Sequence, residues 1–150
     1  MLEFDQLRAA MVAELQEQGI HDTAVLQAMN TVPREHFVPE EYLEYAYYNG
    51  PIPLPAKQTI SQPFVVALML AALKLKPHFN LLEVGTGSGY AAAVASLLVR
   101  QVHTIERQAK LVQYAKIRLN QLGYANIAVH LGDGTLGWPT SAPYDAIVVA

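Results

Sequence analysis

An apolar run that breaks into alternating glycines constrains this chain more than any other feature of its sequence. Leu81–Val84 is followed by Gly85, Gly87 and Gly89, after which an alanine-rich helical pattern begins. Glycine is needed where the backbone takes a positive φ or where a ligand approaches too closely for a Cβ atom. A strand, a tight loop and a helix start with unpaired N–H groups together predict a ligand-binding loop.

The next predicted strand ends in a carboxylate. Val102–Ile105 has the composition of a strand, and Glu106 follows it about 20 residues after the glycine loop. In nucleotide-binding βαβ units, a carboxylate at this place accepts hydrogen bonds from ribose hydroxyls. The loop and Glu106 therefore predict a bound nucleoside. The competing interpretation is a glycine-rich turn that binds nothing.

The spacing of the glycines indicates which nucleoside. A dinucleotide fingerprint has a small residue where this chain has Tyr90, and no Gly-Lys-Ser/Thr sequence follows to bind a phosphate. The pattern Glu83-x-Gly85-x-Gly87-x-Gly89 resembles instead the first motif of class I S-adenosylmethionine-dependent methyltransferases. That resemblance implies S-adenosyl-L-methionine as cofactor, with its amino-acid part at the loop and no bound phosphate.

Composition agrees with one globular domain. The 150 residues are 52% hydrophobic and 15% charged, which predicts a sizeable core. The formal net charge of −3 gives no basic field, so we expect no nucleic-acid partner. The longest apolar stretch, 63–73, is far shorter than the ~20 residues that span a bilayer, so we expect no membrane association. Without cysteine, a signal-peptide pattern or histidines at metal-ligand spacing, the sequence predicts a cytoplasmic protein with no metal site.

The periodicity predicts a βαβ alternation behind an N-terminal helical extension. A first helix is expected to stop at Gly19, and Asp22 is placed to cap a second helix that runs to about Met29. Segment 33–63, rich in proline and tyrosine, is expected to be an irregular functional loop. Ser61 is then expected to cap a helix that runs to about Leu75. The rest of the pattern predicts strands 81–84, 101–105, 127–131 and 145–150, with helices 89–99 and 107–122.

The predicted fold class is α/β, a Rossmann-like class I methyltransferase with a doubly wound, mostly parallel sheet covered on both faces. We expect one domain, 1–150, in which 1–80 supplies the N-terminal helices and the substrate loop and 81–150 the cofactor-binding core. Strand 145–150 is apolar on both faces and no helix follows it. Such a strand needs a neighbour on each side, so the sheet is expected to be truncated after this fourth strand, without its C-terminal strands.

A more specific pattern lies at Gln58–Pro63. Its sequence, Gln-Thr-Ile-Ser-Gln-Pro, resembles the active-site motif of protein-L-isoaspartate O-methyltransferases, and further blocks of that family are matched at Val32–Pro39, Ala46-Tyr47, Leu82–Tyr90, Ile105–Arg107, Leu122–Tyr124, Gly132–Pro139 and Ala142–Ile147. The resemblance implies a repair enzyme that methylates the side-chain carboxylate of L-isoaspartyl residues in damaged proteins. Isoaspartyl-containing proteins and peptides are then its partners, and the oligomeric state stays open.

The resemblance also implies roles for single residues. Ser61 is expected to orient the substrate carboxylate, with Thr59 beside it as the second catalytic residue, and Asp133 to contact the adenine amino group. The full set of predicted cofactor-binding residues is Glu83, Gly85, Thr86, Gly87, Ser88, Gly89, Glu106, Asp133 and Gly134. Simpler interpretations exist: Ser61 as a helix cap, Asp133 as a turn residue, and Glu83 as a hydrogen-bond partner of the glycine loop.

The chemistry of such a reaction favours a serine. An isoaspartyl carboxylate has a reference pKa near ~4, so it is an anionic nucleophile at neutral pH and needs no general base. Its placement in line with the methyl group can supply ~7–11 kcal/mol of barrier reduction. An arginine clamp would stabilise the negative charge that is lost as the methyl group moves. A neutral hydroxyl, such as that of Ser61, is more suitable.

Two departures from the family pattern keep other functions open. Many members carry glycine just before the Gln-Thr-Ile-Ser motif, where this chain has Pro55-Ala56-Lys57, which restricts the loop. Members are also commonly longer by several strands that finish the sheet and part of the substrate groove. The alternatives are a methyltransferase of the same fold that acts on a small molecule, and a non-catalytic protein that retains the cofactor pocket.

Overall fold

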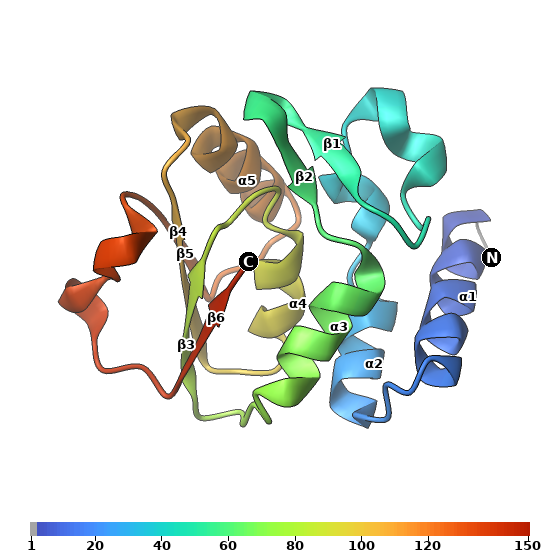
Figure 1. The fold of residues 1–150 in the computed structure, drawn as a ribbon, viewed down its shortest axis with the longest axis horizontal. Helices are drawn as coiled ribbons and strands as arrows, with labels where there is room; N and C mark the ends of the chain where they lie inside the picture. The colour runs from blue at the N-terminus through green and yellow to red at the C-terminus, as the bar shows by residue number, and fades with distance from the viewer. Residues whose placement is uncertain (1–2) are drawn as a thin grey trace.

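A parallel sheet with helices packed against it forms the centre of the computed structural model, which describes residues 3–150 (Figure 1). Within these residues the helices are α1 (Glu3–Glu17), α2 (Thr23–Thr31), α3 (Pro63–Ala72), α4 (Tyr90–Ser96) and α5 (Ala109–Gln121). The strands are β1 (Ile52–Leu54), β2 (Gln58–Ile60), β3 (Asn80–Val84), β4 (Gln101–Glu106), β5 (Ile127–Leu131) and β6 (Ala146–Val149). In this part of the chain no helix has both the length and the apolar character needed to cross a membrane.

The main sheet confirms the predicted parallel α/β arrangement. Its strand order is β5-β4-β3-β6, and every neighbouring pair is parallel. Helices α4 and α5 form the crossovers from β3 to β4 and from β4 to β5, as parallel neighbours require. The chain then returns across the sheet to place β6 on the other side of β3. The strand order therefore reverses between β3 and β6, and ligands of open α/β sheets bind at the carboxyl ends of strands at such a point.

Helices cover one face of the sheet. Side chains alternate between faces along a strand, and Leu81 and Val102, on the face that packs against α4 and α5, are fully buried. On the opposite face, His130 stacks on Trp138 with 4.0 Å between ring centroids, and His103 meets Tyr144 edge to face. Segment 132–145, which carries Trp138 and Tyr144, thus covers part of this second face (Figure 1).

Strand β6 lies at the edge of the sheet in the described part of the chain. Its pairing partner is β3, in register from Leu81 opposite Ala146 to Val84 opposite Val149. The side chains of Ile147 and Val149 are 54% and 67% exposed, respectively. The apolar edge strand predicted from the sequence is therefore present, with its second face open to solvent.

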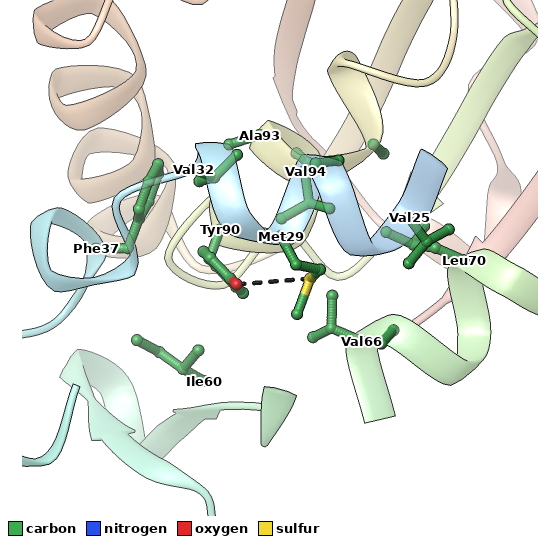
Figure 2. Close-up of a cluster of buried hydrophobic side chains, with 14 of the residues drawn as sticks. Val25, Met29, Val32, Phe37, Ile60, Val66, Leu70, Tyr90, Ala93 and Val94 are labelled. Atoms are coloured by element: carbon green, nitrogen blue, oxygen red, sulfur yellow. Dashed lines mark hydrogen bonds between the residues drawn. The ribbon is translucent and has the colours of Figure 1, made fainter. Parts of the chain in front are cut away.

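The N-terminal helices join the sheet through one hydrophobic cluster (Figure 2). Met29 of α2, Val66 of α3 and Tyr90 of α4 are each at most 2% exposed, and Phe37 packs beside them. The Tyr90 hydroxyl lies 3.6 Å from the sulfur of Met29, and its ring meets Phe37 edge to face at 5.8 Å. A buried aromatic ring of this kind contributes a large apolar area to a core. Tyr90 therefore ties the helix after the glycine loop to the N-terminal layer.

Most predicted boundaries hold; the exceptions are the cap and the end of α3, and the end of α4, which is Ser96 rather than residue 99. Helix α1 ends two residues before Gly19, and the Asp22 carboxylate caps α2 by accepting a hydrogen bond from the Val25 N–H at 3.1 Å, as predicted. The prediction that Ser61 caps the third helix is wrong, because Gln62 is the N-cap of α3 and makes no side-chain cap hydrogen bond. Proline at the first helical position fixes the preceding residue as the cap. Helix α3 also ends at Ala72 rather than near Leu75.

Segment 33–63 is more ordered than the sequence predicted. It contains two 3₁₀ helices, Arg34–Phe37 and Glu40–Tyr45, followed by the hairpin β1–β2. The hairpin strands pair antiparallel, from Ile52 opposite Ile60 to Leu54 opposite Gln58. At its tip, Ala56 and Lys57 have φ of 60° and 57°, a left-handed conformation that is unfavourable for residues other than glycine. The hairpin therefore carries local strain beside Gln58.

Candidate functional site

The loop after β3 adopts the positive φ angles that its glycines predicted. Gly85 and Gly89 have φ of 97° and 92°. A Cβ atom on Gly85 would lie 2.9 Å from the carbonyl oxygen of Ala150, so a side chain does not fit between the ends of β3 and β6. A Cβ atom on Gly89 would lie 3.3 Å from Ala115 and Leu119 of α5. Gly89 thus permits close packing of α4 on α5, whereas Gly85 lies at the point where the strand order reverses.

Glu106 braces the loop from the neighbouring strand. One carboxylate oxygen accepts a hydrogen bond from the Gly87 N–H at 3.1 Å, and the other accepts from the Gln108 N–H at 3.0 Å. The side chain is buried, at 7% exposure. A carboxylate has about four acceptor positions, so two remain available to a ligand. Glu106 can therefore hold the loop and bind a hydroxyl at the same time.

A buried chain of hydroxyls connects Glu83 to the same loop. The Thr104 hydroxyl donates to Glu83 Oε1 at 2.6 Å and lies 2.6 Å from the Thr86 hydroxyl. Because the Thr104 proton is used on Glu83, Thr86 donates to Thr104. Burial raises the pKa of Glu83 to about 7; the Thr104 hydrogen bond opposes this rise and the Glu106 charge adds to it. Glu83 lies behind the loop and reaches it through Thr104 and Thr86.

A cavity of about 180 Å³ separates the glycine loop from the segment that follows the hairpin tip. Its wall is formed by residues from the loop, the hairpin, α3 and the ends of two strands: Gln58, Thr59, Ile60, Ser61, Val66, Met69, Gly85, Thr86, Gly87, Ser88, Tyr90, Ala91, Glu106 and Ala150. The cavity thus brings the two predicted catalytic residues, Thr59 and Ser61, to the predicted cofactor loop. Glu83, Gly89, Asp133 and Gly134 are outside this wall.

Ser61 lines the cavity, and its hydroxyl has no partner among the described residues. Its carbonyl oxygen accepts a hydrogen bond from Arg34 Nη2 at 3.1 Å, while its hydroxyl makes no hydrogen bond within residues 3–150. The simple interpretation of this serine as a helix cap is excluded by the geometry of α3. The backbone of Ser61 is therefore held in place, and its side chain is available to a ligand.

Asp133 and Gly134 form a turn at the same edge of the sheet. The Asp133 carboxylate accepts hydrogen bonds from the hydroxyl and the N–H of Thr135, at 2.7 and 2.9 Å, and these bonds lower its pKa. A Cβ atom on Gly134 would overlap the side chain of Val84, so the turn packs against the end of β3. In this structure Asp133 acts as a turn residue, as its bonds to Thr135 show. Its contact with adenine stays a prediction.

Sequence reasoning did not single out several residues of this region. Arg34 is fully buried and donates to the Ser61 carbonyl, and Met69 and Ala150 line the cavity. The only signal for Arg34 was its place in the block Val32–Pro39, where it follows Pro33. Within the described residues no three His, Cys, Asp or Glu side chains come together in a group that could hold a metal ion.

Comparison with known proteins adds independent information on this arrangement. Residues 6–150 match the family model described as protein-L-isoaspartate(D-aspartate) O-methyltransferase. Proteins named protein-L-isoaspartate O-methyltransferase from Brucella anthropi and Herpetosiphon aurantiacus are 47% and 54% identical to this chain over 150 and 147 residues. The matches cover 100% and 97% of this chain, but only 69% and 66% of those relatives. For a third relative so named, from Rhodopseudomonas palustris, the covered share is 63%. The chain therefore spans about two thirds of the length of these curated relatives.

Solved structures show the same fold. A structure named protein-L-isoaspartate O-methyltransferase is 32% identical, with a TM-score of 0.85 over 95% of this chain and 47% of its own. A Plasmodium falciparum protein described as a protein-L-isoaspartate O-methyltransferase, solved in complex with S-adenosyl-L-homocysteine, has 24% identity and a TM-score of 0.78 over 95% of this chain and 72% of its own. These likenesses confirm the predicted Rossmann-like fold, on which the cavity lies at the switch point of the sheet.

Proposed function

Because this chain belongs to the protein-L-isoaspartate(D-aspartate) O-methyltransferase family, we propose that it methylates the side-chain carboxylate of L-isoaspartyl residues in damaged proteins, with S-adenosyl-L-methionine as cofactor. The observation that carries this proposal is the shared cavity wall: Ser61 and Thr59 lie on one side, and the glycine loop with Glu106 lies on the other. A site for a methyl donor and a site for its acceptor must meet in this way.

The cofactor side of the cavity fits a nucleoside with an attached amino acid. At Gly87 an added Cβ atom would meet no atom closer than 3.7 Å, so the loop leaves space for a ligand. We propose that Glu106 accepts ribose hydroxyls with its two remaining acceptor positions, and that Gly85, Thr86, Gly87 and Ser88 line the site of the amino-acid part. When bound, S-adenosylmethionine supplies the methyl group as an electrophile on a sulfonium centre. The solved complex with S-adenosyl-L-homocysteine supports the same ligand class.

The other predicted cofactor residues act from outside the cavity wall. Asp133 and Gly134 lie on the turn against Val84, and we propose that this turn contacts the adenine. Glu83 fixes the loop through Thr104 and Thr86, and Gly89 sets the distance between α4 and α5. These residues therefore shape the cofactor site, and Glu83 and Gly89 need no direct contact with the ligand.

The substrate side needs only to hold and orient an anion. The isoaspartyl carboxylate, with a reference pKa near ~4, is ionised at neutral pH, so no residue has to remove a proton. We propose that the free hydroxyl of Ser61 donates a hydrogen bond to one carboxylate oxygen and that Thr59 borders the same position. A neutral donor orients the carboxylate while leaving its second oxygen reactive. The proposed partners are thus isoaspartyl-containing proteins and peptides, and the cytoplasmic location stays a proposal.

The test compares two isomers of one peptide. Methyl transfer to an isoaspartyl peptide is measured beside its normal aspartyl isomer, with radiolabelled S-adenosylmethionine and the 150-residue chain. We expect transfer to the isoaspartyl peptide alone. Equal transfer to both isomers, or transfer only to a small carboxylic acid, would support the small-molecule alternative. Binding of S-adenosylhomocysteine without any transfer would support the non-catalytic alternative.

A further inference from the structure

Arg34 is the largest fully buried side chain of the described residues, and it lies directly behind Ser61. Its Nε donates to the Ala46 carbonyl at 2.7 Å, and its Nη2 donates to the Ser61 carbonyl at 3.1 Å. The guanidinium carbon lies 4.6 Å from the centre of the Tyr90 ring. Nη1 is buried and has no hydrogen-bond partner within residues 3–150.

No carboxylate neutralises this guanidinium. The neighbouring residue Glu35 accepts a hydrogen bond from the Tyr47 hydroxyl and lies 3.5 Å from Arg8, which also pairs with Asp5. These are the ion pairs of the part of the chain that the structure describes, and Arg34 belongs to neither. Burial lowers the pKa of Arg34 from its ordinary value, while Tyr90 and Tyr47 oppose the change. An arginine still carries its charge at neutral pH under these conditions.

A buried charge without a counter-ion is costly, and an apolar side chain of similar size would fill the same space at lower cost. The two carbonyl oxygens and the Tyr90 ring compensate the charge only in part. The Arg34 guanidinium therefore lacks an anionic partner among the described residues. Ser61 and Tyr90, which both contact Arg34, also line the cavity in which the substrate carboxylate is proposed to bind.

We propose that Arg34 is a positioning residue that holds Ser61 and whose uncompensated charge selects an anionic group at the Ser61 hydroxyl. This inference rests on the proposed function, because it names the group that the substrate side prefers. Arg34 does not line the cavity, so it acts through Ser61 and through its electric field rather than by contact. The Arg34 charge lies behind Ser61 and does not touch the substrate. It therefore favours the carboxylate over a neutral amide without forming the tight ion pair that would weaken the nucleophile.

The experiment measures how well the site distinguishes a charge from its neutral isostere. Two dissociation constants are determined by titration calorimetry in the presence of S-adenosylhomocysteine, one for an isoaspartyl peptide and one for the same peptide with a side-chain amide in place of the carboxylate. The proteins are the unaltered chain, Arg34→Met, Arg34→Lys and the control Arg100→Met, which alters an exposed arginine. We expect the unaltered chain and Arg100→Met to prefer the charged peptide. In Arg34→Met, the ratio of the two constants should fall at least tenfold.

Arg34→Lys separates charge from positioning and remains informative if Arg34→Met does not fold. A lysine keeps the charge but cannot donate to the Ala46 and Ser61 carbonyls in the same geometry, so both peptides should bind more weakly by similar factors. The preference for the charged peptide should stay within about threefold of that of the unaltered chain. The dissociation constant of S-adenosylhomocysteine should stay within about twofold in every variant. A preference that survives in Arg34→Met, or that disappears in Arg34→Lys, overturns this inference while the proposed function stands. If the unaltered chain binds neither peptide, the proposed function itself fails.

Discussion

The glycine loop and the hairpin that faces it across the cavity are held by different means. Buried side chains brace the loop. Glu106 accepts a hydrogen bond from the Gly87 N–H, and the Thr86 hydroxyl is linked by hydrogen bonds through Thr104 to Glu83. The hairpin has two three-residue strands, a strained tip, and Arg34 behind the residue that follows it. A segment with many buried bonds opens rarely, whereas one with few opens at low cost. The comparison suggests a preformed cofactor side and an adaptable peptide side.

The largest expected effect concerns the pH dependence of the loop brace. Glu83 has an ordinary pKa of 4.5 and a pKa of about 7 in the fold. The folded protein therefore binds the proton more tightly than the unfolded chain, so the stability that this group contributes is complete below pH 4.5 and is lost as pH rises through 7. The loss amounts to about 3 kcal/mol. Urea unfolding at about pH 5 and about pH 8 should show it in the unaltered chain and not in Glu83→Gln.

An exposed carboxylate serves as the control for that measurement. Glu17→Gln, at the end of α1, should keep the full pH dependence of the unaltered chain. If Glu83→Gln also keeps it, Glu83 does not titrate near neutral pH. The stability that Glu83 contributes to the glycine loop would then be independent of pH.

Next in size is the effect of Glu106→Ala on cofactor affinity. The change removes the proposed bonds to the ribose hydroxyls and releases the Gly87 N–H, and charge-assisted bonds of this kind contribute ~1.5–3 kcal/mol. We expect the dissociation constant of S-adenosylhomocysteine to rise by about tenfold or more. Titration calorimetry measures it, with Glu17→Ala as the control. An unchanged constant would remove Glu106 from the site.

On the opposite side of the cavity, Ser61→Ala should lower kcat/KM for an isoaspartyl peptide by about tenfold, since one hydrogen bond to a charged group is lost. The melting temperature should barely change, because the Ser61 side chain caps no helix. Gln62→Ala, which alters the neighbouring residue outside the cavity wall, is the matched control. Methylation at the unaltered rate in Ser61→Ala would show that the hydroxyl has no role in orienting the substrate.

The smallest effect tests the strained tip. Lys57→Gly relieves a positive φ of 57° and should stabilise the fold by about 0.5–1 kcal/mol. Lys74→Gly relieves a φ of 50° after α3, far along the chain from the hairpin, and should stabilise to a similar degree. Only Lys57→Gly should change KM for the peptide, since Gln58 and Thr59 follow it in the cavity wall. An equal effect of both variants on KM would show that the tip does not contribute to peptide binding.

The same comparison explains what the sequence could predict. The glycine loop was predictable because Gly85 and Gly89 meet needs that no other residue type meets, a positive φ and the absence of a Cβ atom. The hairpin was not predictable from the sequence, because Pro53 argues against a strand. In addition, residues such as Ala56 and Lys57 are unfavourable where φ is positive. Tertiary contacts override these local preferences at the tip.

Single side chains of the site show the same limit. Glu106 was placed correctly, since a residue at the end of a predicted parallel strand has a known position relative to the loop. Ser61 was expected as a cap because serine is a better cap than glutamine, but Pro63 fixes the helix start one residue later. Arg34 could not be anticipated, because arginine is mostly exposed and only the packing of Tyr90 and the Ser61 segment encloses it.

The ring stack on the second face of the sheet gives this protein an internal optical reporter. Trp138 is the only tryptophan of the sequence, and it stacks on His130 at 4.0 Å with 17° between the ring planes. A protonated imidazole quenches indole fluorescence more strongly than a neutral one, and burial lowers the pKa of His130. Emission should therefore be bright at neutral pH and dim in acid. Since Trp138 belongs to the same segment as Asp133, its emission would follow events at that end of the site without any added label.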